Sequence, residues 1–356
     1  MSYASNFCTF TGFAEQRGEG HRIAPMDEST PYSGLTPDCV LNAIDSVGYR
    51  CDGRMLGLNS YENRVYQVGF EDDDGESKFI VAKFYRPHRW SDEQIFEEHS
   101  FAFELDDAEI PVVAPLRIGE QSLHEFEGYR FALFPRRGGR APELDDPDVL
   151  EWIGRFIGRI HARGAVSSYV HRPAIDIESF GEQPVQFLLH HDFIPPDLFE
   201  AYKAAAQAAL SAVRDAYKRA GAVDTIRLHG DCHQSNILWT DDGPHFVDLD
   251  DARMGPAVQD LWMLLSGDRA SMTRQFSDVL AGYEDFMEFD RRQLHLIEAL
   301  RTLRILHYAG WIAQRWSDPA FPAAFTWFNT QRYWEEHILQ IKEQISAVQE
   351  APIGTQ

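Results

Sequence analysis

The sequence predicts an α+β protein of two lobes, a mostly antiparallel β lobe followed by a larger helical lobe. Short alternating apolar segments separated by turn residues occupy residues 53–134, and beyond Pro135 apolar residues recur at helical intervals instead. No internal repeat or low-complexity tract interrupts this order. We therefore expect a flexible leader over residues 1–32, a β-rich lobe over 33–135, a helical lobe over 136–348 and a tail over 349–356.

The first lobe should open with a helix and continue as a sheet. Thr36-Pro37-Asp38 is typical of a helix start and precedes an apolar face from Val40 to Val47. A second helix should begin at Ser91, because Gln94 stands three residues later and completes a capping box. The expected strands are Met55–Leu58, Arg64–Phe70, Phe79–Tyr85, Leu116–Ile118 and Tyr129–Phe134.

The second lobe should be built almost entirely from helices. The expected helical stretches are Asp148–Arg163, Pro196–Gly221, Ala257–Leu265, Met272–Phe286, Arg291–Gln314 and Thr330–Val348. Four tryptophans near the C-terminus form either a substrate-side wall or part of the core, and core is the more frequent role of Trp: Trp311, Trp316, Trp327 and Trp334.

Composition excludes several classes of partner. The 356 residues include 33 basic and 56 acidic ones, a formal net charge of -23. Such a surface repels nucleic acid and anionic membranes, and no segment is apolar for the length of a membrane span. The four cysteines, Cys8, Cys39, Cys51 and Cys232, have no CxxC or metal-ligand spacing, so we expect a reducing compartment. Met1–Arg22 has no apolar run of signal-peptide length, so we expect a cytoplasmic protein. We also expect it to be a monomer.

The most informative stretch is Leu228–Trp239, followed by Phe246–Asp250. Asp231 stands five positions before Asn236, and Asp248 follows twelve positions later between apolar residues. Phosphoryl transfer from ATP needs one carboxylate to accept a hydroxyl proton, and an amide and a second carboxylate to hold Mg²⁺. A hairpin of Asn236–Trp239 with Pro244–Leu249 should bring both metal ligands to one end. The sequence thus predicts Asp231 and Asp248 as catalytic residues, with Asn236 and Asp248 on the metal.

Two histidines in this loop have a more modest expected role. His229 and His233 are four positions apart without a zinc-type carboxylate arrangement. We expect them to organise the loop by hydrogen bonding. Asp260, in a helix with apolar neighbours, should reach back to brace the backbone of the same loop. Only twelve positions separate Asp248 from Asp260, which leaves no room for a long phosphorylatable activation segment.

Lys83 lies inside the apolar segment Phe79–Tyr85, where a lysine is seldom buried without a partner. Its ammonium would hold nucleotide phosphates while paired with Glu97 or Glu98 of the following helix. Glu98 is favoured because it shares a helix face with Ala102 and Leu105. The turn Leu58–Tyr66 has no GxGxxG; Ser60 and backbone amides there either contact phosphate or belong to an ordinary hairpin turn.

Several segments together resemble the aminoglycoside and choline phosphotransferase (APH) superfamily. HGDxHxxN at His229–Asn236 marks the superfamily, while LNSYENRVYQV, VAKFYRPHRW, FPRRGGR and VDLDDARMGPAVQDLW resemble its bacterial serine/threonine protein kinases of stress response. The resemblance covers about residues 35–345 and implies the bilobal, protein-kinase-like fold. It also implies an ATP- and Mg²⁺-dependent, autophosphorylating, non-specific serine/threonine protein kinase tied to envelope stress and cell survival. The leader precedes the usual start of such kinases.

By this resemblance Asp231 is the proton acceptor, Asn236 and Asp248 bind Mg²⁺, and Ser60 lies at the ATP site. We expect ATP beside backbone groups of a hinge made by Phe134, Pro135 and Arg136. Two alternatives stay open. A small-molecule kinase of the APH, choline or homoserine kinase type suits the acidic surface and the missing activation segment. A nucleotide-binding scaffold without catalysis would have no use for Asp231.

Overall fold

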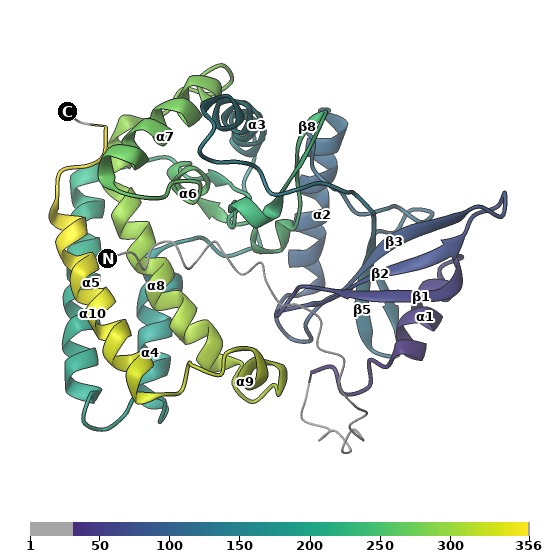
Figure 1. Cartoon of the computed structure of the whole chain (residues 1–356), viewed down its shortest axis with the longest axis horizontal. Coiled ribbons are helices and arrows are strands. Elements are labelled where there is room, and N and C mark those ends of the chain that lie inside the picture. The colour runs from purple at the N-terminus through teal and green to yellow at the C-terminus, as the bar shows by residue number, and fades with distance from the viewer. Residues whose placement is uncertain (1–30, 355–356) are drawn as a thin grey trace. The chain divides into compact units, whose positions relative to one another are not determined.

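The computed structural model describes residues 31–354, and the chain divides into two compact units (Figure 1). Within the described residues the first unit comprises 31–140 and 238–250, and the second comprises 141–237 and 251–354. The first carries a sheet and the second is mainly helical, so the predicted α+β class is confirmed. The predicted leader and Cys8 lie outside the described residues, apart from the leader's last two positions.

The first unit is built on an antiparallel sheet of strand order β1-β2-β3-β5-β4. Its strands and helices are α1 (Pro37–Ser46), β1 (Arg50–Leu58), β2 (Arg64–Glu71), β3 (Ser77–Phe84), α2 (Asp92–Asp107), β4 (His124–Phe126) and β5 (Tyr129–Pro135). Both predicted helix starts are confirmed. The Thr36 side chain accepts from the backbone N–H of Cys39, and Ser91 with Gln94 forms the capping box.

The two helices of this unit pack on opposite faces of the sheet. In β5, Phe131 and Leu133 belong to a core cluster with Val40 and Ile44 of α1. Ala132, between them, instead packs with Ile95 of α2. Since neighbouring residues of a strand point to opposite faces, α1 covers one face and α2 the other.

One predicted strand is wrong. The segment Leu116–Ile118 forms no strand, although Leu116 donates one backbone hydrogen bond to Leu133. The position beside β5 is taken by β4, whose three residues, His-Glu-Phe, are too few to show an alternating apolar pattern. Its turn, Glu127-Gly128, has positive φ at both residues, 49° and 82°, which suits a two-residue hairpin.

The remaining elements are mainly helices, with short strands around the predicted catalytic loop, residues 228–236. They are α3 (Pro147–Gly164), a π-helical turn (Glu178–Glu182), α4 (Gln183–His190), α5 (Phe199–Ala220), β6 (Ile226–Arg227), η3 (Gln234–Asn236), β7 (Ile237–Thr240), β8 (Gly243–Phe246), η4 (Leu249–Asp251), β9 (Met254–Gly255), α6 (Val258–Trp262), α7 (Arg269–Tyr283), η5 (Arg291–Leu296), α8 (Ile297–Gln314), α9 (Ala320–Ala324) and α10 (Gln331–Gln349). The helical turn Glu178–Glu182, α4 and α9 were not predicted, and α6 is shorter than Ala257–Leu265.

The predicted hairpin exists as β7 and β8, but its second strand ends earlier than expected. Strand β8 stops at Phe246 rather than Leu249, because Asp248 has a φ of 63° and the short 3₁₀ turn η4 begins at the next residue. A left-handed residue cannot continue a strand.

Close packing of α3 against α7 depends on three glycines. A Cβ added to Gly154 or Gly282 would lie 2.0 or 1.9 Å from a backbone oxygen of the facing helix, and one at Gly158 would lie 2.6 Å away. The two helix backbones therefore touch directly. This packing fixes His161 of α3, which lies behind the catalytic loop.

Candidate active site

The sheet of the first unit places Lys83 on the face covered by α2. Lys83 is one residue from Ala82 and Phe84, which point to the α1 face. Its Nζ lies 3.3 Å from Oε1 of Glu98, 3.1 Å from Oδ1 of Asp248 and 3.0 Å from Oδ1 of Asp250. Burial alone would lower the pKa of Lys83, but the Asp250, Glu98 and Asp248 carboxylates raise it well above its usual value. The lysine is therefore a fixed cation.

Of the two glutamates that the sequence left open, Glu98 is the one paired with Lys83. Glu98 is 3% exposed and lies on the inner face of α2 with Ile95, Ala102 and Leu105. These residues recur at three- and four-residue intervals, the spacing of one helix face. Glu97 occupies the neighbouring, half-buried position and makes no ion pair with Lys83.

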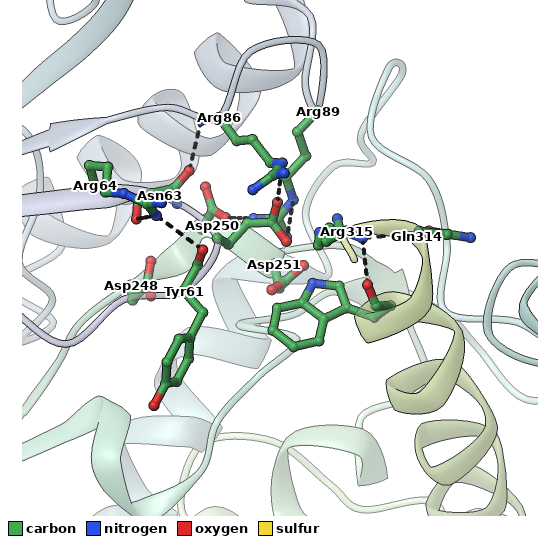
Figure 2. A network of polar contacts seen from close by, with 12 residues as sticks. Tyr61, Asn63, Arg64, Arg86, Arg89, Asp248, Asp250, Asp251, Gln314 and Arg315 are labelled. Carbon is green, nitrogen blue, oxygen red and sulfur yellow. Dashed lines mark hydrogen bonds and ion pairs between the residues drawn. The ribbon is translucent and has the colours of Figure 1, made fainter. Parts of the chain in front are cut away.

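A network of ion pairs continues from Lys83 through Asp250. Arg89 forms an ion pair with Asp250, and Arg86 lies 3.5 Å from Glu62. Figure 2 shows Arg86 and Arg89 reaching from one segment toward Asp250. Each of these four side chains is about one-tenth exposed or less. The sequence reading missed Asp250 and Arg89, although Asp250 stands two positions after Asp248 in the Val-Asp-Leu-Asp motif.

The buried charges in this network balance, and Asp248 is the carboxylate left over. Three buried cations, Lys83, Arg86 and Arg89, face three buried carboxylates, Glu62, Glu98 and Asp250. The Asp248 side chain is 50% exposed, and within residues 31–354 Lys83 is its one ionic partner. Its surplus negative charge and its exposure are what a cation ligand requires.

The turn between β1 and β2 is fixed by side chains rather than by glycines. The Asn63 side-chain oxygen accepts from the Arg86 backbone N–H at 3.1 Å, and the Tyr32 hydroxyl donates to the Glu62 carbonyl at 3.0 Å. Arg64 donates to the carbonyls of Tyr61 and Asn63 at 3.3 Å each. Ser60, in the middle of this turn, stays a predicted ATP contact.

The three predicted hinge residues lie at the end of β5. Phe134 and Pro135 pair with Val81 and Ile80 of β3, and the Arg136 side chain donates to the Gln67 amide oxygen at 3.2 Å. Their contact with adenine stays a prediction.

The predicted catalytic loop belongs to the second unit and runs from β6 to η3. The Asp260 carboxylate accepts from the backbone N–H groups of His229 and Gly230, at 2.8 and 2.9 Å, which confirms its predicted bracing role. His161 of α3 lies 3.0 Å from the same carboxylate. Gln259 donates to the Gly230 carbonyl at 3.2 Å. The loop backbone is thereby held on both its donor and its acceptor groups.

Gly230 makes the sharp turn before Asp231. Its φ is 85°, and a Cβ there would lie 2.0 Å from the Asp251 carbonyl oxygen. Only glycine combines this conformation with so close an approach of two backbone segments. The Gly of the HGD motif is therefore required by local geometry.

The Asp231 carboxylate has a cationic partner on one oxygen and a histidine on the other. Arg304 of α8 lies 2.7 Å from its Oδ1, and His233 Nε2 lies 3.3 Å from its Oδ2. Burial would raise the pKa of Asp231, but Arg304 and His233 lower it well below the usual range. His233 also accepts the Ser235 backbone N–H at its Nδ1, which confirms that it organises the loop. Arg304, 73 positions after Asp231, left no local signal in the sequence.

The Asn236 side chain fits the predicted metal ligand. Its Nδ2 donates to the Asp231 carbonyl at 3.0 Å, so the amide orientation is set and the amide oxygen remains available as an acceptor. Residues 31–354 contain no cluster of three or more His, Cys, Asp or Glu side chains suited to a metal. An amide oxygen suits Mg²⁺, which keeps waters and substrate phosphates among its ligands.

The four tryptophans near the C-terminus differ in burial. Trp334 is fully buried and Trp327 is 39% exposed, so the four tryptophans are not uniformly core.

In the described part of the chain, no helix has the length and apolar character needed to span a membrane. Cys39, Cys51 and Cys232 are all free thiols.

Comparison with known proteins agrees with the resemblance drawn from the motifs. A sequence profile of the phosphotransferase enzyme family (APH) matches residues 56–297. Stress response kinase A of Escherichia coli K12 is 44% identical over 322 residues, 90% of this chain and 96% of that protein. The serine/threonine protein kinase RdoA of Salmonella typhimurium LT2 is 44% identical over 92% of this chain and 98% of that protein.

The fold also matches solved structures. Amicoumacin kinase hAmiN, in complex with AMP-PNP and Ca²⁺, superposes with a TM-score of 0.67 at 17% identity, covering 89% of this chain and 94% of that one. At this identity the likeness supports the kinase-like fold alone. With a family match over more than half of its length, this chain belongs to the phosphotransferase enzyme family, and this membership implies ATP-dependent phosphoryl transfer.

Proposed function

We propose that this chain is an ATP- and Mg²⁺-dependent, non-specific serine/threonine protein kinase that phosphorylates itself and serves the envelope stress response and cell survival. The relatives named as stress response and serine/threonine protein kinases support the acceptor class, because the identity extends over nine-tenths of the chain. The observation that carries the chemistry is the surplus, half-exposed carboxylate of Asp248 beside the buried Lys83.

In this proposal each residue has one task. Asp231 orients the acceptor hydroxyl and takes its proton as the hydroxyl oxygen attacks the γ-phosphorus and the bond to ADP breaks. Lys83 holds the nucleotide phosphates, and Glu98 and Asp250 hold Lys83. Asn236 and Asp248 would hold Mg²⁺, which would supply positive charge to the phosphate oxygens. Ser60 and the hinge residues 134–136 would contact ATP.

The setting that we propose is the cytoplasm, with the protein as a monomer. The free thiols of Cys39, Cys51 and Cys232 support a reducing compartment, where disulfides do not persist. Neither nucleic acid nor an anionic membrane is proposed as a partner, because the net charge of -23 opposes both.

A small-molecule kinase is the second candidate, and one observation favours it. The segment from Asp248 to Asp260 is filled by η4, β9 and the start of α6, with no long loop that phosphorylation could order. The absence of such a segment is compatible with an acceptor as small as an amino alcohol.

The deciding experiment offers both acceptor classes at once. The purified chain is incubated with ATP and Mg²⁺, alone, with a generic protein and with a panel of small alcohols, and phosphosites are mapped by mass spectrometry. We expect phosphoserine or phosphothreonine on the chain itself. Asp231→Asn should lower that transfer by about two to four powers of ten while nucleotide binding persists. Asp241→Asn, an exposed carboxylate of the same hairpin region, serves as the control. Transfer to small alcohols alone would contradict the protein kinase proposal.

A further inference from the structure

A single tyrosine connects the turn between β1 and β2 to the strand that carries Lys83. The Tyr32 hydroxyl shares its proton between two backbone carbonyls, that of Glu62 in the turn at 3.0 Å and that of Phe84 in β3 at 3.3 Å. Phe84 directly follows Lys83, and Tyr32 is only 7% exposed. All four residues belong to the first unit, so this connection lies within one compact part of the chain.

Both the hydroxyl and the ring of Tyr32 are held in place. Burial raises the pKa of the Tyr32 hydroxyl well above its usual value, although the charges of Arg64 and Arg86 lower it. The hydroxyl therefore stays protonated at neutral pH and remains a donor. The Tyr32 ring stacks on that of Tyr129, with centroids 6.4 Å apart, and the Arg64 guanidinium lies 4.4 Å from the Tyr32 ring centroid. Tyr32 is thus a rigidly placed donor.

Tyr32 and Arg64 together hold the three carbonyls of Tyr61-Glu62-Asn63, which we call the turn tripeptide. Arg64 donates to the outer two, and Tyr32 donates to the middle one. Figure 2 shows Arg64 beside Tyr61 and Asn63. The C=O and N–H of a trans peptide point in opposite directions, so the Asn63 N–H, which shares a peptide plane with the Glu62 carbonyl, points away from Tyr32. The backbone of the turn therefore has one defined orientation.

The side chains of the turn tripeptide are tied to the residues that follow β3. Asn63 Oδ1 accepts the Arg86 backbone N–H at 3.1 Å, and Arg86 Nε lies 3.5 Å from Oε1 of Glu62. Arg86 stands three positions after Lys83. Polar and ionic contacts thus act on the side chains of the turn, whereas Tyr32 holds its backbone with a neutral group. Loss of the Tyr32 hydroxyl would therefore loosen the backbone without changing any charge near the predicted phosphate contacts.

Ser60 directly precedes the turn tripeptide, as Lys83 directly precedes Phe84. We propose that Tyr32 is a positioning residue for the phosphates of ATP, which holds the turn with Ser60 at the distance from Lys83 that lets both reach the phosphate groups. This inference rests on the proposed function, because it takes Ser60 and Lys83 as the phosphate contacts. A turn without glycine adapts little, so its position has to be set before the nucleotide binds.

The test uses Tyr32→Phe in the full-length chain, which removes both hydrogen bonds and keeps the ring. Calorimetry measures the affinity for ATP and ADP, each with Mg²⁺, and for adenosine. We expect ATP and ADP to bind about three- to ten-fold more weakly, the scale of one lost hydrogen bond. Adenosine should bind as before, because adenine is predicted to contact the hinge residues 134–136. In autophosphorylation, KM for ATP should rise by a similar factor while kcat is kept, as for a loss of uniform binding.

Tyr49→Phe is the matched control, since Tyr49 packs against the same core and its ring contacts Phe70 edge-on, with centroids 4.9 Å apart; it should leave all three affinities unchanged. Hydrogen exchange of residues 59–65 gives a second measurement, in which ATP with Mg²⁺ should protect these amides more in the wild-type chain than in Tyr32→Phe. Unchanged ATP affinity in Tyr32→Phe, or an equal loss for adenosine, would overturn this inference and leave the kinase proposal standing. A wild-type chain that does not bind ATP would overturn both.

Discussion

Neutralising Asp250 tests whether the buried ion network is needed to hold Lys83. Asp250→Asn keeps the shape of the side chain and removes its charge. Asp250 is 3% exposed and lies against both Lys83 and Arg89. In the wild-type chain the buried cations and carboxylates of this network are equal in number, so the substitution leaves one buried positive charge in excess.

The expected loss of stability in Asp250→Asn depends on which carboxylates remain near Lys83 and Arg89. Lys83 keeps Glu98 at 3.3 Å and Asp248 at 3.1 Å, and Arg89 still lies 4.0 Å from Glu62. Removing one partner of a buried pair costs roughly 3–5 kcal/mol. Because Lys83 stays well paired, we expect the lower end, about 3 kcal/mol of opening free energy in the first unit.

Hydrogen exchange followed by mass spectrometry on the β3 peptide, Ser77–Phe84, measures the free energy of opening of the first unit. A loss of about 3 kcal/mol raises the exchange rate of protected amides by roughly a hundredfold. Asp92→Asn is the control, because Asp92 pairs with Arg130 at the surface of the same unit with 58% of its side chain exposed; it should cost less than about 1 kcal/mol. A change below about 1 kcal/mol for Asp250→Asn would refute the reasoning.

Three further predictions concern the proposed metal ligand Asp248, the loop glycine Gly230 and the buried histidine His337. Asp248→Asn should fold normally, since Asn tolerates the φ of 63°, yet lose Mg²⁺-dependent nucleotide binding in calorimetry; unchanged binding would contradict the metal assignment. Gly230→Ala should lower the melting temperature far more than Gly221→Ala, because both have positive φ but only Gly230 faces a backbone oxygen, at 2.0 Å. Burial lowers the pKa of His337 to about 4 in the folded chain, whereas in the unfolded chain its pKa is about 6.5. Between these two pH values the unfolded chain therefore binds the proton and the folded chain does not. Stability should therefore fall as pH drops from about 6.5 to 4, and His337→Gln should flatten that slope in denaturant titrations where the exposed-site control His190→Gln does not.

Local patterns were enough to predict much of the fold. Caps at Thr36 and Ser91 were readable because a helix start depends on a few neighbouring residues. The pairing of Lys83 with Glu98 followed from helix periodicity once the face of α2 was known. Strand β4 was missed because it is only three residues long, two of them polar, and its Glu-Gly turn lacks the usual Asn or Asp.

Contacts between residues far apart in the sequence could not be predicted from local sequence patterns. Arg89 and Asp250 are 161 positions apart, and Arg304 and Asp231 are 73 apart. An arginine in an amphipathic helix has the same pattern whether it faces water or a catalytic carboxylate. The roles of Asp231, Asn236 and Asp248 were predicted because their spacing reflects the chemistry itself, and those roles now await the experiments above.

The glycine contact between α3 and α7 has a consequence for how this chain can vary. His161 of α3 contacts the Asp260 carboxylate, which in turn accepts from the backbone N–H of His229 in the loop. The distance between the two helices therefore influences the position of the loop through His161 and Asp260. Gly154, Gly158 and Gly282 are each confined by facing backbone rather than by movable side chains. In a library of random variants, inactivating changes should therefore gather at these three sites as well as around the catalytic groups, and compensating changes there should be rare.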